Sequence, residues 1–230
     1  MKKWSDTQDL ILASSRRYVF AHKASGRLSQ KSDREDDSLQ NQMEAYHKRP
    51  LHILSRLDRP VSGIVTFSKE SSFTKHFLKE QQASKVTKTY LAVVADRWEG
   101  ETRQLTHYHW HDKKHMKARL TAEPVTGSTK VTLDCRLLGH LERYSVLELT
   151  LGSGRYHQIR AQLAATGHHI KGDVRYGARR GNKNRSIHLH AWRMEMKDLQ
   201  GDPLRMEAAL DMEDPLWAIV HKMTTEQNGE

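Results

Sequence analysis

The sequence predicts an α+β fold. Strand-like runs outnumber helical runs, and the two kinds do not alternate strictly along the chain, as they would in an α/β protein. Hydrophobic residues make up 37% and charged residues 29% of the 230 residues, a balance typical of a globular protein and not of a membrane or disordered one. A chain of this length can bury its core as one domain or as two small ones.

Strands are predicted where β-branched, aromatic and other apolar residues gather between turn signals. A short strand that runs into a glycine turn is expected within 17–26, and the stretch 54–67 leads from a turn-prone segment into a β-rich run. The other predicted strands are 87–95, 131–138, 144–151 and 188–196, with a turn near Gly139.

Helices are predicted where apolar residues recur at spacings of three and four. Within 29–49, Leu39, Met43 and Tyr46 follow this spacing, so one helix is expected to rest lightly on the core. A helix over 157–167, ended by a glycine, and a closing helix over 215–223 are also expected.

A further helix is predicted to begin at a cap formed by Ser71 or Ser72 and to run through Gln82. Its inner side is expected to carry three large apolar residues, Phe73, Phe77 and Leu78.

Two parts of the chain give no clear pattern. Residues 1–17 are expected to form a loose N-terminal lead-in, so that a single domain spans 18–230. Residues 98–124 are rich in His and Lys without a period, and an excursion over the surface is expected there.

The positive charge is concentrated in one part of the sequence. The formal net charge is +10, and residues 151–193 hold nine Lys or Arg against one acid, whereas residues 194–230 hold nine acids and three bases. A basic segment of this kind predicts a polyanionic partner such as RNA, although net charge alone is equally compatible with a merely soluble protein.

The single cysteine, Cys135, excludes an internal disulfide and any multi-cysteine metal site. It stands in an apolar alternation and is expected to be a buried strand residue. No long apolar run and no hydrophobic signal sequence occur, so a cytoplasmic protein without membrane attachment is expected.

Asp58 is the candidate reactive group, standing between Arg56 and Arg59. A carboxylate with cationic neighbours stays ionised, and a partly desolvated carboxylate is a nucleophile for an electrophilic sugar carbon. A salt bridge without catalytic function is the more common use of so short a pattern, and these residues alone leave both open.

The segment 107–115 raises the possibility of a metal site. If it were a strand, His107, His109 and His111 would share one face, and imidazole is a common zinc ligand. Two neighbouring lysines would repel a cation and no Glu lies nearby as a base, so a solvated or RNA-facing loop is favoured.

The sequence has no phosphate-binding loop, dinucleotide fingerprint or nucleophile elbow.

Four motifs, in order and within about 18–196, resemble the RluA-type RNA pseudouridine synthases, which convert uridine in RNA to its C-glycoside isomer. The family motifs are His-Arg-Leu-Asp-Arg-x-Thr-Ser-Gly-Leu, Lys-x-Tyr-x-Ala-x-Val, Thr-Gly-Arg-x-His-Gln-Ile-Arg followed by Gly-His-Pro-Ile-x-Gly-Asp-x-x-Tyr-Gly, and Leu-His-Ala. They correspond here to 55–64, 88–94, 153–160 with 167–177, and 189–191. The resemblance implies a single catalytic domain with a mixed, largely antiparallel central sheet flanked by helices. Many members of the family carry a small N-terminal RNA-binding domain, and none is expected here because the catalytic pattern begins near Tyr18.

The chain departs from the family pattern at a few positions. Ser55 replaces His, Val61 and Ser153 replace Thr, His169 replaces Pro, and Ala24 replaces the Pro of an early Lys-Pro-x-Gly. None of these changes removes the aspartate, tyrosine or arginine of the motifs, so they bear on substrate choice more than on activity.

The resemblance implies catalytic roles for Asp58, Tyr90 and Arg160. Asp58 would attack C1′ of a flipped uridine or remove a 2′ proton, and the residues leave both routes open. Arg160 would pair with the aspartate, and Tyr90 would pack against the base and assist removal of the C5 proton. Arg56 would fill the gap that the extruded base leaves in the RNA stack.

The expected RNA contacts share a positive charge or a polar ring. They are Arg56, Arg59, Arg155, His157, Lys171, Arg175, Arg179 and Arg180, joined by Lys183 and Arg185. Such contacts to phosphates would give salt-dependent affinity without sequence specificity.

The resulting expectation is an RNA pseudouridine synthase that acts on tRNA or rRNA, with no metal, no other cofactor and no obligate protein partner. A catalytically inactive RNA-binding protein is the main alternative. A metal-dependent enzyme that uses 107–115 is less favoured.

Overall fold

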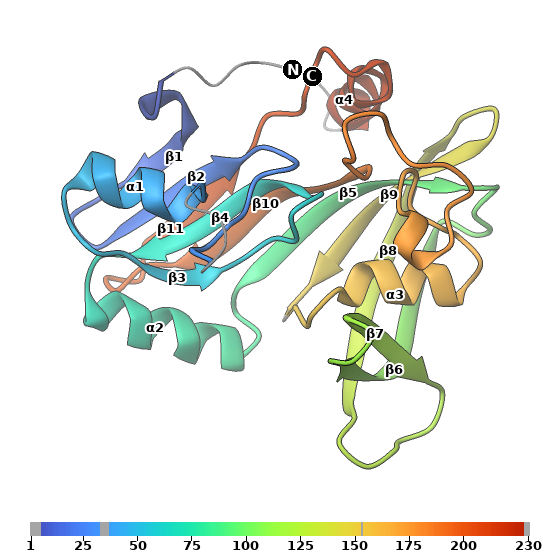
Figure 1. Cartoon of the computed structure of the whole chain (residues 1–230), viewed down its shortest axis with the longest axis horizontal. Coiled ribbons are helices and arrows are strands. Elements are labelled where there is room, and N and C mark those ends of the chain that lie inside the picture. The colour runs from blue at the N-terminus through green and yellow to red at the C-terminus, as the bar shows by residue number, and fades with distance from the viewer. Residues whose placement is uncertain (1–5, 33–36, 153, 228–230) are drawn as a thin grey trace. The chain divides into compact units, whose positions relative to one another are not determined.

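The computed structural model describes residues 6–32, 37–152 and 154–227, and the chain divides into two compact units (Figure 1). The first unit comprises the chain up to Lys88 and again from His190, and the second unit comprises Thr89–Leu189. The chain therefore passes from the first unit to the second and back once.

The first unit is built on a sheet with helices beside it. Its strands are β1 (Ile11–Ser14), β2 (Tyr18–Lys23), β3 (His52–Ser55), β4 (Ser62–Ser68), β10 (Leu189–Lys197) and β11 (Pro203–Glu207). Its helices are the 3-10 helix η1 (Gln8–Leu10), α1 (Leu39–His47), α2 (Ser71–Gln82) and α4 (Pro215–Gln227). The strand order is β1-β2-β4-β10, with β3 also on β4 and β11 also on β10.

Both faces of this sheet are buried, because successive side chains of a strand point to opposite sides. On one face, Val19 of β2 packs with Leu39 and Met43 of α1. On the other face, Phe20 of the same strand packs with Phe73 of α2. The two helices therefore cover opposite faces of the first unit's sheet (Figure 1).

Two segments that are distant in the sequence meet where β4 runs parallel to β10. His190 is buried, and burial lowers its pKa to about 4, so its ring is neutral. Its Nε2 donates to the carbonyl oxygen of Ala208 at 3.1 Å, and its Nδ1 accepts from Ser62 Oγ at 2.8 Å. Beside this pair, Gly63 lies so close to β10 that a Cβ atom there would clash with the backbone of Ala191.

The second unit is a run of paired strands with one main helix. Its strands are β5 (Thr87–Ala95), which starts in the first unit, β6 (Thr102–Asp112), β7 (Lys117–Thr121), β8 (Thr129–His140) and β9 (Tyr144–Leu151). Its helices are α3 (Gln158–Ala165) and the 3-10 helix η2 (Val174–Tyr176). The strand order is β5-β9-β8-β6-β7, and the pairs β7 with β6, β6 with β8 and β8 with β9 are antiparallel.

Buried amide side chains fix α3 on this sheet. Gln158 Nε2 donates to the carbonyl oxygen of Thr132 in β8 at 3.0 Å, and Gln162 Nε2 donates to that of Leu105 in β6 at 3.1 Å. Because these groups are buried, each bond satisfies a polar atom that would otherwise be costly to desolvate. The bonds set the position of α3 and therefore of Arg160 on it.

The predicted α+β class with a mixed, largely antiparallel sheet is confirmed. Most strand pairs are antiparallel, and β4 with β10 is parallel. The strands predicted within 17–26, 54–67, 87–95, 131–138, 144–151 and 188–196 are all present, and Cys135 is buried in β8 as expected. The turn predicted near Gly139 and His140 joins β8 and β9 slightly later, at 141–143, because β8 continues through an irregularity to His140.

The expectation of a surface excursion at 98–124 is wrong. Residues 102–121 form the β6–β7 hairpin, and β6 also pairs with β8. The strand pattern was hidden because β6 buries only Leu105 and His109, while most of its other side chains are polar and at least partly exposed. The strand β11 was also not predicted, since its exposed residues alternate with only two half-buried ones.

The helices differ from prediction at their ends. The first begins at Leu39, where Ser38 Oγ accepts from a backbone amide, and not near 29; residues 33–36 lie outside the described part. The second is preceded by Glu70 and not by a serine cap. Leu78 does not face inward, as its side chain is 45% exposed.

The N-terminal segment is not loose over 8–14. It forms η1 and β1, and Leu10 is buried in the core cluster shared with α1. Residues 1–5 of the predicted lead-in lie outside the described part of the chain.

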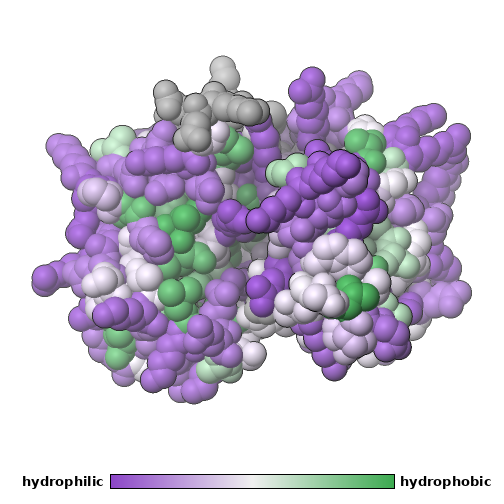
Figure 2. All heavy atoms as spheres, turned by 60° about the horizontal axis from the view of Figure 1, so that its bottom comes forward, coloured by the Kyte–Doolittle hydropathy of each residue, from purple (hydrophilic) through white to green (hydrophobic). Residues whose placement is uncertain are grey.

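The surface is mainly hydrophilic on the face drawn in Figure 2, in keeping with the charged composition. Within the described residues, every helix is too short or too polar to cross a membrane.

Replacing Gly63 by Ala is expected to destabilise the protein. Its φ of 114° disfavours an L side chain, and the new Cβ would clash with the β10 backbone. We expect the free energy of unfolding in urea to fall by about 2 kcal/mol or more. The matched control is Gly201→Ala, at φ 92° with no atom within 4 Å of the new Cβ, which should cost only ~1 kcal/mol. Equal losses would contradict the close approach of β4 and β10.

Candidate active site

Asp58 lies in the loop between β3 and β4, and its side chain is half-buried. The amide of Val61 donates to the carbonyl oxygen of Asp58 at 3.0 Å, which closes a turn. On the other side, Leu57 packs against the core cluster beneath α1. The carboxylate is therefore carried by a hydrogen-bonded turn with an apolar anchor.

The loop that follows β2 fixes the backbone on both sides of Asp58. Ser29 Oγ accepts from the amide of Leu57 at 3.0 Å and donates to the Leu57 carbonyl oxygen at 2.8 Å. The amide of Gly26 donates to the Arg59 carbonyl oxygen at 2.7 Å, and Arg59 Nε donates to the Gly26 carbonyl oxygen at 2.8 Å. Two reciprocal pairs of bonds thus hold the residues before and after the carboxylate.

Lys23, the last residue of β2, is fully buried next to this turn. Its Nζ donates to the carbonyl oxygens of Ala24 at 3.0 Å, Arg27 at 2.8 Å and Arg59 at 3.2 Å. Burial lowers the pKa of Lys23 to about 7, an effect that Asp58 opposes. Lys23 therefore joins the loop after β2 to the turn that carries Asp58.

Arg160 forms a two-point ion pair with Asp173. Its Nε lies 2.6 Å from Asp173 Oδ2 and its Nη2 lies 2.7 Å from Oδ1, and the two side chains are 5% and 2% exposed. The guanidinium carbon also lies 5.0 Å from the centre of the Tyr176 ring. The fork of Arg160 is thus held in one orientation, while its pairing with Asp58 stays a prediction.

His157 precedes α3 in a left-handed conformation with φ of 51°. The Tyr176 hydroxyl accepts from the amide of Ala118 at 2.8 Å and donates to Nδ1 of His157, 2.9 Å away. Burial and then the charge of Arg160 lower the pKa of His157 to about 3. His157 is therefore a neutral ring at physiological pH, and an RNA contact through it would be made without a positive charge.

The β6–β7 hairpin is attached to the segments around α3. Arg175 Nη1 donates to the Met116 carbonyl oxygen at 3.0 Å, and the Tyr156 hydroxyl donates to the same oxygen at 3.3 Å. The rings of His111 and Tyr156 stack with centroids 4.0 Å apart, and His109 Nε2 donates to the Tyr156 carbonyl oxygen at 2.9 Å. In the part of the chain that the structure describes, no group of three or more His, Cys, Asp or Glu side chains is placed to hold a metal ion.

The predicted RNA-contact residues differ in how exposed their side chains are. Those with exposed side chains are Arg56, Arg59, Arg155, Arg175, Arg179, Arg180, Lys183 and Arg185. Lys171 is half-buried and donates to Asn182 Oδ1 at 2.8 Å, so it orders its own loop. Tyr90 is half-buried in β5, and Ser153 of the third motif lies outside the described residues.

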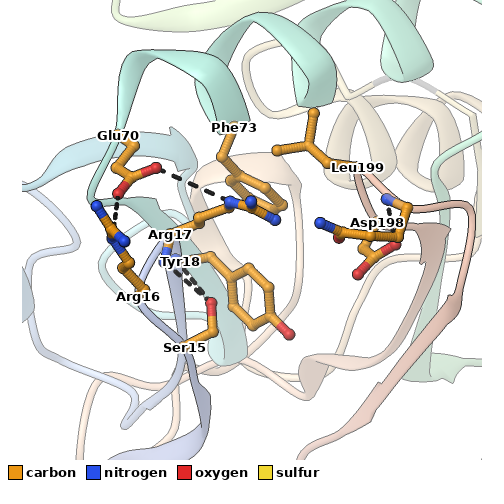
Figure 3. Close-up of a pocket in the computed structure, with 9 residues that line it drawn as sticks. Ser15, Arg16, Arg17, Tyr18, Glu70, Phe73, Asp198 and Leu199 are labelled. Carbon is orange, nitrogen blue, oxygen red and sulfur yellow. Dashed lines mark hydrogen bonds and ion pairs between the residues drawn. The ribbon is translucent and has the colours of Figure 1, made fainter.

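A pocket of about 390 Å³ lies at the start of β2 (Figure 3). The Asp58 turn lies at the other end of this strand, where Lys23 bonds to it. The rings of Tyr18 and Phe73, 5.0 Å apart, form part of its wall with two arginines and the acids Glu70 and Asp198. Tyr18 begins β2, so about five strand residues, or roughly 16 Å, separate the pocket from the turn. Its acidic side chains do not suit an RNA backbone.

Sequence reasoning missed residues whose partners are distant. Asp173 lies in the third motif and is the single acid of the basic segment, and that isolation is a signal that could mark it as a partner for an arginine. Lys23 carried a signal in the Lys-x-x-Gly pattern that precedes the turn. Tyr176 and His190 belong to recognised motifs, but no spacing in the sequence indicates which groups they bond.

The chain belongs to the RNA pseudouridylate synthase family, whose model matches residues 17–165. It is 34% identical over 138 residues to an uncharacterized RNA pseudouridine synthase of Chloroflexus aurantiacus, covering 60% of this chain and 40% of that one. It is 31% identical over 159 residues to tRNA pseudouridine synthase C of Pasteurella multocida, and the match covers 64% of this chain and 63% of that one.

The match spans 40% to 44% of the length of the first curated relatives. Among solved structures, human RNA pseudouridylate synthase domain containing 1 superposes with a TM-score of 0.74 at 18% identity, covering 93% of this chain and 94% of that one. This likeness shows that the fold is that of a pseudouridine synthase domain.

Replacing Asp173 by Asn is expected to leave the buried Arg160 charge without its carboxylate. The free energy of unfolding should fall by about 3–5 kcal/mol, the usual result of removing one partner of a buried ion pair. The control is Glu148→Gln, which breaks the more exposed pair with Arg136 and should cost less than about 1 kcal/mol. Urea unfolding followed by fluorescence measures both, and a small loss in Asp173→Asn would contradict the structural role of the pair.

Proposed function

We propose that the protein is an RNA pseudouridine synthase in which Asp58 is the catalytic carboxylate. The observation that carries this proposal is the turn of Asp58, which occupies the central motif of the family and has hydrogen bonds on both sides of the aspartate. A fixed backbone limits the positions open to the carboxylate, which lowers the entropy that must be lost on reaching the transition state.

The proposed reaction breaks the N-glycosidic bond of a uridine and forms a bond from C1′ to C5 of the same uracil. Asp58 attacks C1′ to form an ester, which breaks when C5 bonds to C1′, or it removes a 2′ proton that is later returned. After the base has turned and re-attached, the C5 proton leaves and N1 takes a proton from solvent. Enzymes that hydrolyse glycosides usually need two carboxylates, one for the leaving group and one for the nucleophile or water. One carboxylate is sufficient here, because the detached uracil is a tolerable anion and no water replaces it.

Three other residues have proposed roles around the flipped nucleoside. Arg160 keeps Asp58 ionised and oriented, and its ion pair with Asp173 supports this role by fixing the guanidinium fork. Tyr90 packs against the uracil and assists loss of the C5 proton. Arg56, which is exposed beside Asp58, fills the space left in the RNA stack.

The proposed substrate is tRNA or rRNA, and the proposed place of action is the cytoplasm. Relatives are named tRNA pseudouridine synthase C and ribosomal large subunit pseudouridine synthase C, which supports both RNA classes. The exposed arginines at 155, 175, 179 and 180 supply positive charge for phosphates. Their contribution would weaken as salt is added, because binding releases counterions from the RNA.

A catalytically inactive RNA-binding protein with the same fold is the rival proposal. It is disfavoured because Asp58, Tyr90 and Arg160 are all retained. An assay of the chemical step separates the two, since only a synthase exchanges the hydrogen at C5.

Asp58→Asn is expected to abolish isomerisation while leaving the fold and RNA binding in place. Unmodified host RNA labelled with tritium at C5 of uridine should release tritium to water with the wild type. The variant should be slower by at least about 10³-fold, the order of loss seen when a catalytic group is removed. Asp202→Asn, an exposed aspartate in the turn after β10, is the control and should match the wild type. Equal tritium release by Asp58→Asn would contradict the proposed role.

A further inference from the structure

Three backbone carbonyl groups converge on the side-chain nitrogen of Lys23. They belong to Ala24 at 3.0 Å, Arg27 at 2.8 Å and Arg59 at 3.2 Å, and the lysine is fully buried. An ammonium group has three N–H donors, whereas a neutral amine has two and a lone pair that repels a carbonyl oxygen. The observed bonds can therefore all form only when Lys23 is protonated.

The bond to Arg59 links the lysine to catalysis. Arg59 directly follows Asp58, and its carbonyl oxygen receives N–H groups from both Lys23 and Gly26. A neutral amine could donate to only two of the three carbonyl oxygens, so loss of the proton would weaken the bonds that join Arg59 to the loop after β2. The turn would then be looser at the residue next to the carboxylate.

The charged groups that act on Lys23 have opposing effects. Asp58 favours the ammonium form, and Arg27 and Arg59 disfavour it. Burial has the largest effect, and together these lower the pKa of Lys23 from 10.5 to about 7. A change of protonation therefore falls within the physiological range.

We propose that Lys23 is a positioning residue, whose proton holds the Asp58 turn in its reactive conformation and so sets the upper pH limit of the reaction. This inference rests on the proposed function. Loss of the proton removes one hydrogen bond from the three carbonyls and one positive charge from beside the Asp58 carboxylate. Lys23 acts through the backbone and charge of the turn and does not touch the substrate.

The stability of the fold should change in the opposite direction to activity. Because the pKa of Lys23 is lower in the folded protein than in the unfolded chain, the unfolded chain binds more protons between pH 7 and 10.5. The contribution of Lys23 to the free energy of unfolding therefore rises with pH in this window. Above pH 7, deprotonation of Lys23 should therefore lower the activity without unfolding the protein.

The first test is the pH dependence of single-turnover tritium release, with the protein in excess over C5-labelled RNA. Between pH 7 and 9 the wild-type rate should fall at least about tenfold, following one deprotonation. Lys23→Met should give a rate no higher than that of the wild type at pH 9, with no further fall over this range. Lys88→Met is the matched control, since among the described residues of the first unit Lys88 is the other buried lysine and has a pKa lowered to about 8. It should retain the fall.

A second measurement does not depend on Lys23→Met being folded. Carbon NMR of lysine ε-carbons against pH gives the pKa of Lys23, which should equal the pKa of the rate profile. In Asp58→Asn the NMR pKa should drop, because the favourable carboxylate charge is gone.

The outcomes separate the two proposals. A flat wild-type profile, a fall that persists in Lys23→Met, or an NMR pKa that differs from the kinetic one would overturn the role of Lys23 alone. No tritium release at any pH would overturn the proposed function, and the role of Lys23 with it.

Discussion

The hydrogen bonds between the loop after β2 and the turn of Asp58 are the constraint on which the proposed site depends. Ser29 holds Leu57 through both its amide and its carbonyl group, and Arg59 is bonded in the same reciprocal way to Gly26. These bonds are intact because β2 and β4 are paired and buried between α1 and α2. The core of the first unit therefore determines how tightly the carboxylate is placed.

Each unit prepares its own part of the proposed chemistry. The first unit carries Asp58 on a bonded turn, and the second carries Arg160 with its fork fixed by Asp173. Asp173, which holds Arg160, is buried, and so are Ser29 and Lys23, which bond the residues on either side of Asp58; buried hydrogen bonds are electrostatically stronger than those in water. Groups oriented before the substrate arrives need little reorganisation during the reaction.

Much of the fold could be predicted because buried positions recur at regular intervals along a strand or helix, and apolar residues occupy them. In β8 every second residue from Val131 to Cys135 is buried, and the apolar alternation shows it. In β6 the alternation of apolar and polar residues is weak, because the strand is held largely by backbone pairing with β7 and β8. Strands of that kind carry polar side chains and resemble loops when read as a sequence.

The sequence was enough to predict which residues belong to the site, but it did not show which other residues they bond. The motifs identified Asp58 and Arg160, but a motif does not show that Asp173 binds Arg160 from thirteen residues away. Nor does it show that Lys23 bonds the carbonyl of Arg59, thirty-six residues later. Such pairings follow from tertiary structure, since the chain's path between the two residues decides whether they meet.

The most direct test of the central claim is a map of pseudouridines in the total RNA of the host after deletion of the gene. Chemical adducts read by primer extension locate each modified position. The account predicts that at least one position loses its pseudouridine, that the wild-type gene restores it, and that Asp58→Asn does not. Retention of every pseudouridine in the deletion strain, or restoration by Asp58→Asn, would contradict it.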